Sequence, residues 1–302
     1  MRLPRVRALR HGLLTSVAVL GVFVVLGVVD LRTVVAADTL LAPLTARAEA
    51  TVTPTGSGRA TVTFADAAGR PQTVQVDAVG AAPGASTVAY DPADPTRVAL
   101  PSTPELVAAD RATTDLAVLG FLALVVLAIG AQRVISRSRL RRTPAREASV
   151  RRVRQQNRLL SRSWVEVEGA VPVQRFPVYF DPALVTLDSP TRLLVHGSGP
   201  LRAIRIGEQW VYPSGRVGTR EPRGQLIDNP AHPDAAARDR AARSAPLRRQ
   251  LKLDGVLLAP APFVGIFWVF LDGGGVTVWI SATLVTAVLA LWGAAVLGSD
   301  PS

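Results

Sequence analysis

Four long apolar stretches interrupt an otherwise polar chain of 302 residues, and none of them contains a charged residue. They are Leu13–Val29, Leu116–Ala131, Val256–Leu271 and Val276–Leu297. Because an α-helix rises about 1.5 Å per residue, about 20 residues cross a hydrocarbon core about 30 Å thick. The last stretch is that long by itself, and flanking residues extend the other three. The pattern therefore predicts transmembrane helices over 13–35, 113–135, 254–271 and 276–297.

Arginine is distributed unevenly around these stretches. Four arginines and no acid precede the first one, whereas the interval 30–111 carries six arginines and nine acids. The interval 132–255 carries 24 basic and 11 acidic residues. Because basic residues near membrane ends stay on the cytoplasmic side, we expect a cytoplasmic N-terminus (1–12), an extracytoplasmic first domain, a cytoplasmic second domain and a cytoplasmic C-terminus. This is the topology of a multi-pass protein of the cell inner (plasma) membrane.

The first stretch has a second interpretation, as a cleaved signal peptide. The arginines before it form a basic n-region, and Val35-Ala36-Ala37 resembles a cleavage site. The apolar run is long for a signal peptide, however, and Asp30 and Arg32 separate it from that site. These features favour an uncleaved anchor.

The predicted outer domain, 38–110, consists of short alternating segments separated by Gly- and Pro-rich turns. The segments are 46–53, 59–64, 72–77, 86–90 and 97–100. Alternation of period two is typical of half-buried strands, so the interval predicts a small antiparallel β meander.

The turn at Tyr90-Asp91-Pro92-Ala93-Asp94-Pro95 is the most distinctive motif of this domain. Both prolines fix their own φ and hold the preceding residues extended. Asp91 and Asp94 can accept hydrogen bonds from the backbone of the turn. We expect a structural turn rather than a Ca²⁺ site, because Ca²⁺ takes six to eight oxygen ligands.

The run Ser86–Leu100, with Val88, Tyr90, Asp91, Pro92 and Pro95, resembles the signature of bacterial membrane proteins classified as domain of unknown function 3592. The resemblance covers about residues 46–135. In that family a compact β domain lies between two membrane helices, so the resemblance implies this architecture here. It implies no activity, because the family has none established.

A dense run of arginines opens the inner interval. Val150, Val153, Asn157 and Leu160 are spaced like one face of a helix, so we expect a basic juxtamembrane helix over 136–163. It is either a solvated stop-transfer segment or a helix that lies on anionic inner-leaflet lipid. The candidate lipid-contacting residues are Arg137, Arg139, Arg141, Arg142, Arg146, Arg151 and Arg152.

A second β pattern follows over 164–230, with Trp164 and Trp210 as its expected aromatic core. Its predicted strands are 164–168, 174–180, 184–187, 192–196, 201–206 and 209–212. They predict a small barrel or curled sheet, followed by a basic juxtamembrane helix over 233–253. Val178–Ala183 repeats the strand–turn pattern of Val88–Ala93, which indicates either a duplicated β module or chance similarity. A different strand order in the two domains would exclude duplication.

The sequence offers little catalytic chemistry. It has no cysteine and only three separated histidines, His11, His196 and His232, so we expect no disulfide, no metal site and no cofactor. Glu166 and Glu168 share one strand face, which we interpret as solvated. An alternative anion site is the Arg- and Gly-rich loop 215–224, which contains Arg216, Arg220 and Arg223.

Together these patterns predict an α-helical membrane protein with four transmembrane spans plus two small all-β soluble domains. The net charge of +11 resides mainly on the inner interval, so it predicts no nucleic-acid partner. Lys252 is the only lysine among 34 basic residues, as in high-GC, actinobacterial-type genomes. We expect a non-enzymatic role in interaction, sensing or envelope assembly, with the anionic inner leaflet and other membrane or envelope proteins as partners. The alternative is a small-ligand, phosphate-binding or enzymatic cytoplasmic domain that uses loop 215–224.

Overall fold

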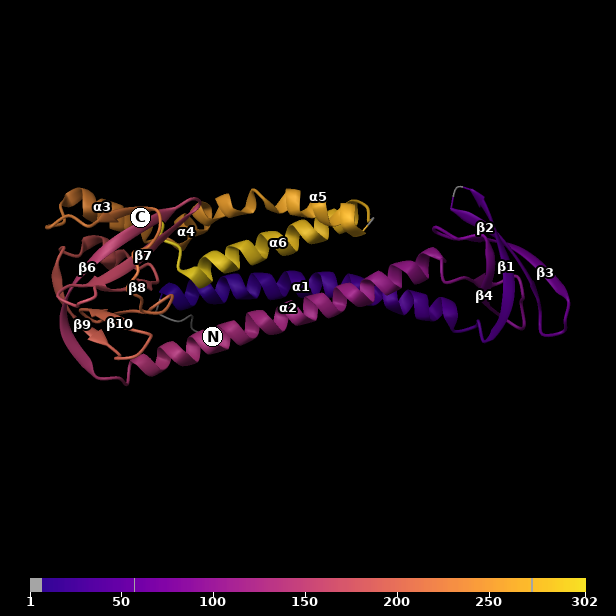
Figure 1. The fold of residues 1–302 in the computed structure, drawn as a ribbon, viewed down its shortest axis with the longest axis horizontal. Coiled ribbons are helices and arrows are strands. Elements are labelled where there is room, and N and C mark those ends of the chain that lie inside the picture. Colours follow the sequence, from indigo (N-terminus) through magenta and orange to yellow (C-terminus); the bar gives the residue numbers. More distant parts are fainter. Residues whose placement is uncertain (1–6, 57, 273) are drawn as a thin grey trace. The chain divides into compact units, whose positions relative to one another are not determined.

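The computed structural model describes residues 7–56, 58–272 and 274–302 (Figure 1). Arg2 and Arg5 of the predicted N-terminal segment, and Gly273 between the third and fourth predicted spans, lie outside these residues. Contacts divide the chain into two units. One unit comprises the chain up to Val22 together with Ala123–Ser302, and the other comprises Phe23–Leu122.

Four helices are long and apolar enough to cross a membrane, as the hydropathy pattern predicts. They are α1 (Arg7–Leu41), α2 (Pro104–Leu140), the helical segment Leu247–Asp272 and α6 (Val276–Leu297). The first two extend beyond the predicted spans at both ends, because polar residues that flank an apolar run continue the same helix. Only α6 has the predicted bounds.

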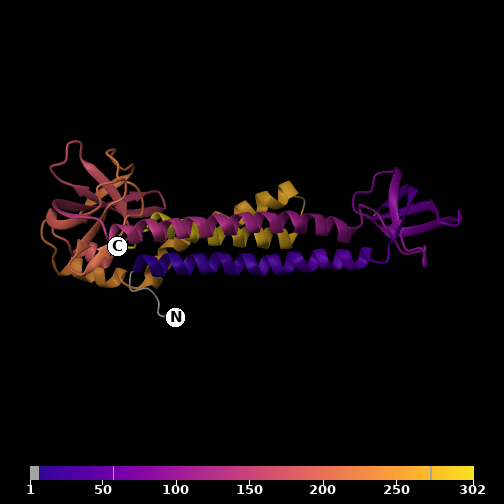
Figure 2. The ribbon, with the colours of Figure 1, turned by 90° about the horizontal axis from the view of Figure 1, so that it is seen from below.

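The third helical segment is interrupted. It consists of α4 (Leu247–Asp254), a 3₁₀ turn (Gly255–Leu258) and α5 (Ala261–Asp272). Pro260 lies in the break, where its ring and missing N–H would disrupt a continuous helix. Figures 1 and 2 both show α5 and α6 side by side as a helical hairpin. Gly265 permits this contact, since a Cβ there would lie 2.3 Å from the Oγ1 of Thr283.

The unit Phe23–Leu122 contains a five-stranded antiparallel sheet in the order β3-β2-β1-β4-β5. The strands are β1 (Ala46–Gly56), β2 (Arg59–Ala65), β3 (Pro71–Asp77), β4 (Gly84–Tyr90) and β5 (Val98–Ala99). All five predicted segments are therefore confirmed as strands. The predicted meander is right only for β1–β3, because β4 returns to pair with β1. The core contains Val62, Val88 and Leu100, with the rings of Phe64 and Tyr90 5.0 Å apart.

The motif after β4 forms the structural turn that the sequence predicts. The Oδ1 of Asp91 accepts a hydrogen bond from the backbone N–H of Ala93 at 2.9 Å. The Oδ1 of Asp94 accepts from both the N–H and the hydroxyl of Thr96, at 3.2 and 2.6 Å. Both aspartates thus stabilise the turn between Pro92 and Pro95.

The other unit contains a seven-stranded antiparallel sheet in the order β11-β10-β9-β6-β7-β8, with β12 also paired to β6. The strands are β6 (Ala145–Asn157), β7 (Leu160–Val167), β8 (Gln174–Val178), β9 (Thr191–His196), β10 (Ala203–Ile206), β11 (Gln209–Val211) and β12 (Gln225–Asp228). The predicted strand 184–187 is wrong, because Pro182–Thr186 forms a 3₁₀ helix that Asp181 caps. An additional strand, β12, lies between the last predicted strand (209–212) and the predicted helix over 233–253.

The predicted basic helix over 136–163 is wrong beyond Leu140. Residues 145–157 and 160–167 form the long hairpin β6–β7, with Arg158 at a φ of 53° in its turn. The spacing that suggested a helical face arose from Val150 and Val153, which are buried on opposite faces of β6. The second predicted helix is confirmed as two shorter ones, α3 (Ala235–Ser244) and α4, which are separated at Pro246.

The core of this sheet is aliphatic apart from Phe176. Val150, Val165, Leu184 and Ile204 are among its fully buried side chains. The expectation of a tryptophan core is wrong, since Trp164 and Trp210 are only half-buried. Trp210 lies on the edge strand β11 and Trp164 lies on β7 inside the sheet, and the ring of each faces an arginine.

The two similar turns do not come from a duplicated module. Asp181 accepts a hydrogen bond from the N–H of Ala183 at 3.0 Å, as Asp91 does from Ala93. However, β4 lies inside its sheet between β1 and β5, whereas β8 is the last strand of the other sheet. The strand orders differ, so the shared turn is a local similarity.

Candidate functional site

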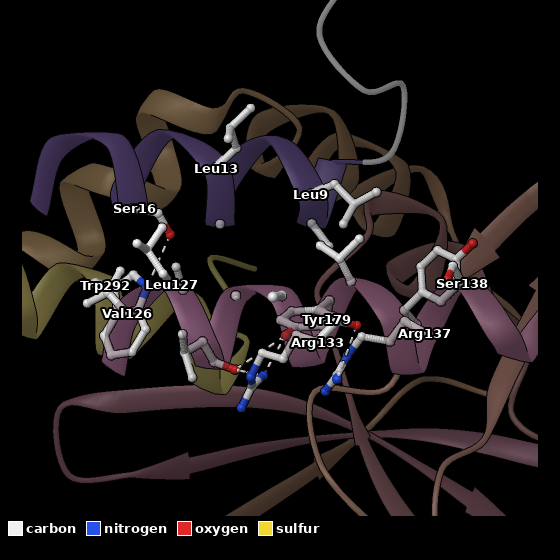
Figure 3. Close-up of a pocket in the computed structure, with 18 of the residues that line it drawn as sticks. Leu9, Leu13, Ser16, Val126, Leu127, Arg133, Arg137, Ser138, Tyr179 and Trp292 are labelled. Carbon is white, nitrogen blue, oxygen red and sulfur yellow. Dashed lines mark hydrogen bonds between the residues drawn. The ribbon is translucent and has the colours of Figure 1, made fainter. Parts of the chain in front are cut away.

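A pocket of about 520 Å³ lies within the unit that holds the larger sheet. It is lined by the first turns of α1, the last turns of α2 and the end of α6 (Figure 3). Leu13, Val126, Leu127 and Trp292 line one end. The indole N–H of Trp292 donates to the hydroxyl of Ser16 at 3.2 Å, so the polar atom of this ring is already bonded. That end of the pocket is therefore apolar, as ligand pockets usually are.

The other end of the pocket is basic. Arg133 and Arg137 lie one turn apart on α2, and Arg141 follows at the same spacing, one residue beyond the end of the helix. The hydroxyl of Tyr179 accepts from Arg133 at 2.5 Å, and that of Tyr212 accepts from Arg141. The guanidinium groups of Arg137 and Arg141 also lie 5.8 and 5.9 Å from the ring centres of Tyr179 and Trp210, respectively. Aromatic side chains of the sheet thus hold the arginines in place.

These arginines have neutral partners. Arg137 donates to the carbonyl of Pro213 at 2.9 Å, and Arg133 donates to the carbonyls of Ser214 and Val296. Arg162, on β7, donates to the carbonyl of Leu297 at 2.9 Å. Burial lowers the pKa of Arg162, and the positive charge of Arg133 lowers it further. Among the described residues, no ion pair includes any of these four arginines.

A buried polar junction connects α1, α4 and the end of α6. The side-chain amide of Gln250 donates to both the carbonyl and the hydroxyl of Ser299, each at 2.9 Å. The hydroxyl of Ser299 donates to Asp254 at 3.0 Å, and the Nε2 of His11 lies 3.5 Å from the same carboxylate. Arg7 donates to the side-chain oxygen of Gln250 at 2.9 Å. Three helical segments that are distant in sequence therefore meet at Ser299.

The next residue, Asp300, anchors the end of α6 in the sheet. Its side chain is fully buried, and its Oδ2 accepts from Arg152 and from the hydroxyl of Ser163, both at 2.7 Å. The backbone N–H of Asp300 donates to the carbonyl of Ser161 at 2.9 Å. Burial by itself would raise the pKa of Asp300, but Arg152 and the hydrogen bonds from Ser163 and Ser302 outweigh burial and lower it. The carboxylate is thus held charged beside a buried guanidinium.

The seven arginines that the sequence groups as lipid-contacting do not share one surface. Arg137 and Arg141 line the pocket, and Arg139, Arg142 and Arg146 are exposed. The remaining two lie on β6, where Arg151 pairs with Glu166 at 2.5 Å and Arg152 pairs with Asp300. A surface-lying helix that includes these last two does not form.

Glu166 is buried, which corrects its interpretation as part of a solvated face. Burial by itself would raise its pKa, but Arg175 and Arg151 on either side of the carboxylate outweigh burial and lower it. Glu168 lies at the end of the hairpin and accepts from the hydroxyl of Ser149 at 2.8 Å. The two carboxylates therefore have separate partners.

The Arg- and Gly-rich loop has little free backbone for an anion. The N–H groups of Val217 and Gly218 donate to the carbonyls of Pro200 and Arg175, both at 2.8 Å. The side chains of Arg216, Arg220 and Arg223 are exposed. Within the described ranges, no hydrogen bond or ion pair links these three side chains to one another.

The histidines are separated in the structure as in the sequence. The Nδ1 of His196 lies 3.2 Å from the carbonyl of Thr143, and its ring lies 4.4 Å from that of Trp210. The exposed His232 lies 3.8 Å from Asp188. No cluster of three metal-ligating side chains occurs among residues 7–56, 58–272 and 274–302.

Sequence reasoning missed the pocket and the junction. The four-residue spacing of Arg133, Arg137 and Arg141 is visible in the sequence and could have indicated one basic helix face. No local pattern indicates that Tyr179 and Tyr212 converge on that face, or that Asp300 reaches Arg152.

Comparisons with protein-family models, curated proteins and solved structures found no match to this chain. The resemblance around Tyr90–Pro95 accordingly stays a prediction.

Proposed function

We propose that this chain is a non-enzymatic integral membrane protein that transmits changes among its membrane helices to its larger sheet domain. Both termini and that domain lie in the cytoplasm in this proposal, and the smaller sheet lies outside. The four apolar helices support membrane insertion. The excess of basic residues over 132–255 supports the orientation.

The observation that carries the proposal is the way in which α6 ends. Only Gly298 separates the last helical residue, Leu297, from Ser299, and Ser299 and Asp300 are both buried in polar contacts. Asp300 is bonded to Arg152 on β6 and to the carbonyl of Ser161 on β7. Because only Gly298 and Ser299 separate Asp300 from α6, β6 and β7 must accommodate any displacement of α6. Such direct attachment suits sensing or interaction.

The environment of the titratable groups also supports a non-catalytic role. Glu166 is held between two arginines, which lower its pKa and make its carboxylate a weak base. His196 is engaged by a backbone carbonyl and an aromatic ring. These contacts stabilise the domain, and they do not position Glu166 or His196 as a catalytic acid or base.

Coupling can be tested from within the membrane hairpin. In Gly265→Leu the new side chain would collide with Thr283 and Trp279 and separate α5 from α6. We expect faster hydrogen exchange at the backbone amides of β6 and β7 when the full chain is reconstituted in vesicles. Gly293→Leu is the matched control, because a Cβ at Gly293 meets no atom within 4 Å.

Unchanged exchange in β6 and β7 of Gly265→Leu would overturn the coupling proposal. An equal increase in Gly293→Leu would also overturn it, since the effect would then not depend on the α5–α6 contact.

A further inference from the structure

The pocket combines two environments along one helix. At about 1.5 Å per residue, the lining from Val126 to Arg141 extends about 22 Å. One leaflet of a bilayer that is about 40–45 Å thick, including headgroups, has a similar depth. The apolar lining belongs to the predicted membrane span, and Arg137, Ser138 and Arg141 lie just beyond it. The pocket is therefore amphipathic in the same direction as a lipid.

Charge distinguishes which lipid the pocket suits. The positive charges of Arg133, Arg137 and Arg141 repel one another around the end of α2, and the oxygens that accept hydrogen bonds from them here are neutral. A guanidinium has five N–H donors. In the described part of the chain, the guanidinium of Arg141 makes hydrogen bonds only through its Nε. The basic end thus lacks the negative charge that a phosphate would supply.

We propose that the pocket binds one anionic phospholipid of the cytoplasmic leaflet. Its phosphate contacts the guanidinium groups of Arg137 and Arg141, and an acyl chain lies against Leu13, Val126 and Trp292. The inference rests on the proposed placement of the helices in a bilayer and adds a ligand to it. A free phosphate ion would leave the apolar end unfilled, and a neutral lipid would leave the arginines uncompensated.

Trp292 provides a direct probe, because bromine on an acyl chain quenches only indoles that it contacts. The full chain is reconstituted in phosphatidylcholine vesicles that contain equal amounts of either brominated phosphatidylglycerol or brominated phosphatidylcholine. The difference in quenching between the parent and Trp292→Phe gives the contribution of Trp292 and removes that of the other four tryptophans. We expect stronger quenching of Trp292 by phosphatidylglycerol.

The arginines are tested with charge-matched variants. Arg137→Gln/Arg141→Gln should reduce the preference for phosphatidylglycerol by on the order of tenfold, since each basic residue near a membrane surface contributes appreciably to anionic-lipid binding. Arg139→Gln/Arg142→Gln removes the same charge from residues that do not line the pocket and should retain the preference. An equal loss in both variants would overturn the inference in favour of a general surface potential.

Another variant and its control leave the arginines intact. Gly130 lines the apolar part of the pocket, and a Cβ there meets no atom within 4 Å. Gly130→Leu should therefore fit the fold, fill the pocket and reduce the quenching of Trp292. Gly120→Leu, on the same helix but outside the pocket, should not.

Three further results would contradict the lipid site. They are equal quenching of Trp292 by the two brominated lipids, undiminished quenching in Gly130→Leu, and displacement of phosphatidylglycerol by inorganic phosphate. Each could occur while Gly265→Leu still alters exchange in β6 and β7, so failure of this inference is distinguishable from failure of the coupling proposal.

Discussion

Replacing Asp300 with asparagine should loosen the attachment of α6 to the larger sheet. The substitution preserves the shape of the side chain but leaves the guanidinium of Arg152, which is 4 % exposed, without a counter-charge. Removing one partner of a buried ion pair typically costs about 3–5 kcal/mol. Arg152 and Ser163 both donate to this carboxylate at 2.7 Å, so we expect a cost within that range.

Hydrogen exchange of the full chain measures this cost locally. The amide N–H of Asp300 is bonded to the carbonyl of Ser161 at 2.9 Å, so its exchange reports opening of the attachment. A loss of 3–5 kcal/mol corresponds to exchange that is roughly 150- to 4,000-fold faster. Asp228→Asn is the matched control. Its partner Arg151 lies 3.4 Å away at a half-exposed position, and exposed pairs contribute at most about 1 kcal/mol.

The same pair predicts a dependence on pH. Because the folded protein lowers the pKa of Asp300, its contribution to stability is complete above the unfolded-state pKa of about 3.9. That contribution is lost as the pH falls through the lower folded-state pKa. Opening at residue 300, corrected for intrinsic exchange, should therefore increase at acid pH in the parent chain but much less in Asp300→Asn.

Two outcomes would refute this reasoning. One is exchange in Asp300→Asn within about fivefold of the parent, which is the range of an exposed pair. The other concerns Arg152→Met/Asp300→Leu, which removes both charges and should be less destabilised than Asp300→Asn, because the cost arises from an unpaired buried charge. If the double variant opens as readily as the single one, the ion pair is not the source of the stability.

Three further substitutions test other parts of the fold. Gly298→Ala should destabilise the end of α6 by about 1–3 kcal/mol, because Gly298 has a φ of +78° and a Cβ would lie 2.8 Å from Ser214. Thermal unfolding measures this loss, and the control Gly293→Ala should not show it. Phe64→Ala should lower the stability of the smaller sheet by about 3–5 kcal/mol, measured as faster hydrogen exchange in β1 and β2. Unchanged exchange in these strands would be inconsistent with a core position of Phe64. The carboxylate of Glu166 should titrate below its ordinary pKa. The infrared band of this carboxylate, isolated by subtracting the spectrum of Glu166→Gln from that of the parent, should therefore persist at pH values where exposed glutamates are protonated.

The sequence predicts best where local pattern and tertiary environment agree. The helix α6 has the predicted bounds, since its 22 uncharged residues are followed by Gly298, whose left-handed backbone terminates a helix. The strands of the smaller sheet were predicted because alternating residues such as Val62 and Phe64 point into a core formed by the same short interval. In both cases, nearby residues determine the structure.

The prediction failed where burial depends on distant residues. The arginine-rich hairpin β6–β7 is stable because Glu166 pairs with Arg151 and Asp300 pairs with Arg152, the latter across 148 residues. A periodicity of Val150 and Val153 contains no information about those partners. The pocket was missed for the same reason, because its basic residues lie at the end of α2, whereas its tyrosines come from the segments that follow β8 and β11.

The central claim, that the four apolar helices place the larger sheet in the cytoplasm, can be tested by labelling single cysteines. The chain has no cysteine of its own, and Ala68, Ser198 and Asp272 are exposed. A membrane-impermeant maleimide added to intact cells should label Ala68→Cys and Asp272→Cys, and should label Ser198→Cys only after the cells are permeabilised. Labelling of Ser198→Cys in intact cells, or protection of Ala68→Cys, would contradict the proposed topology.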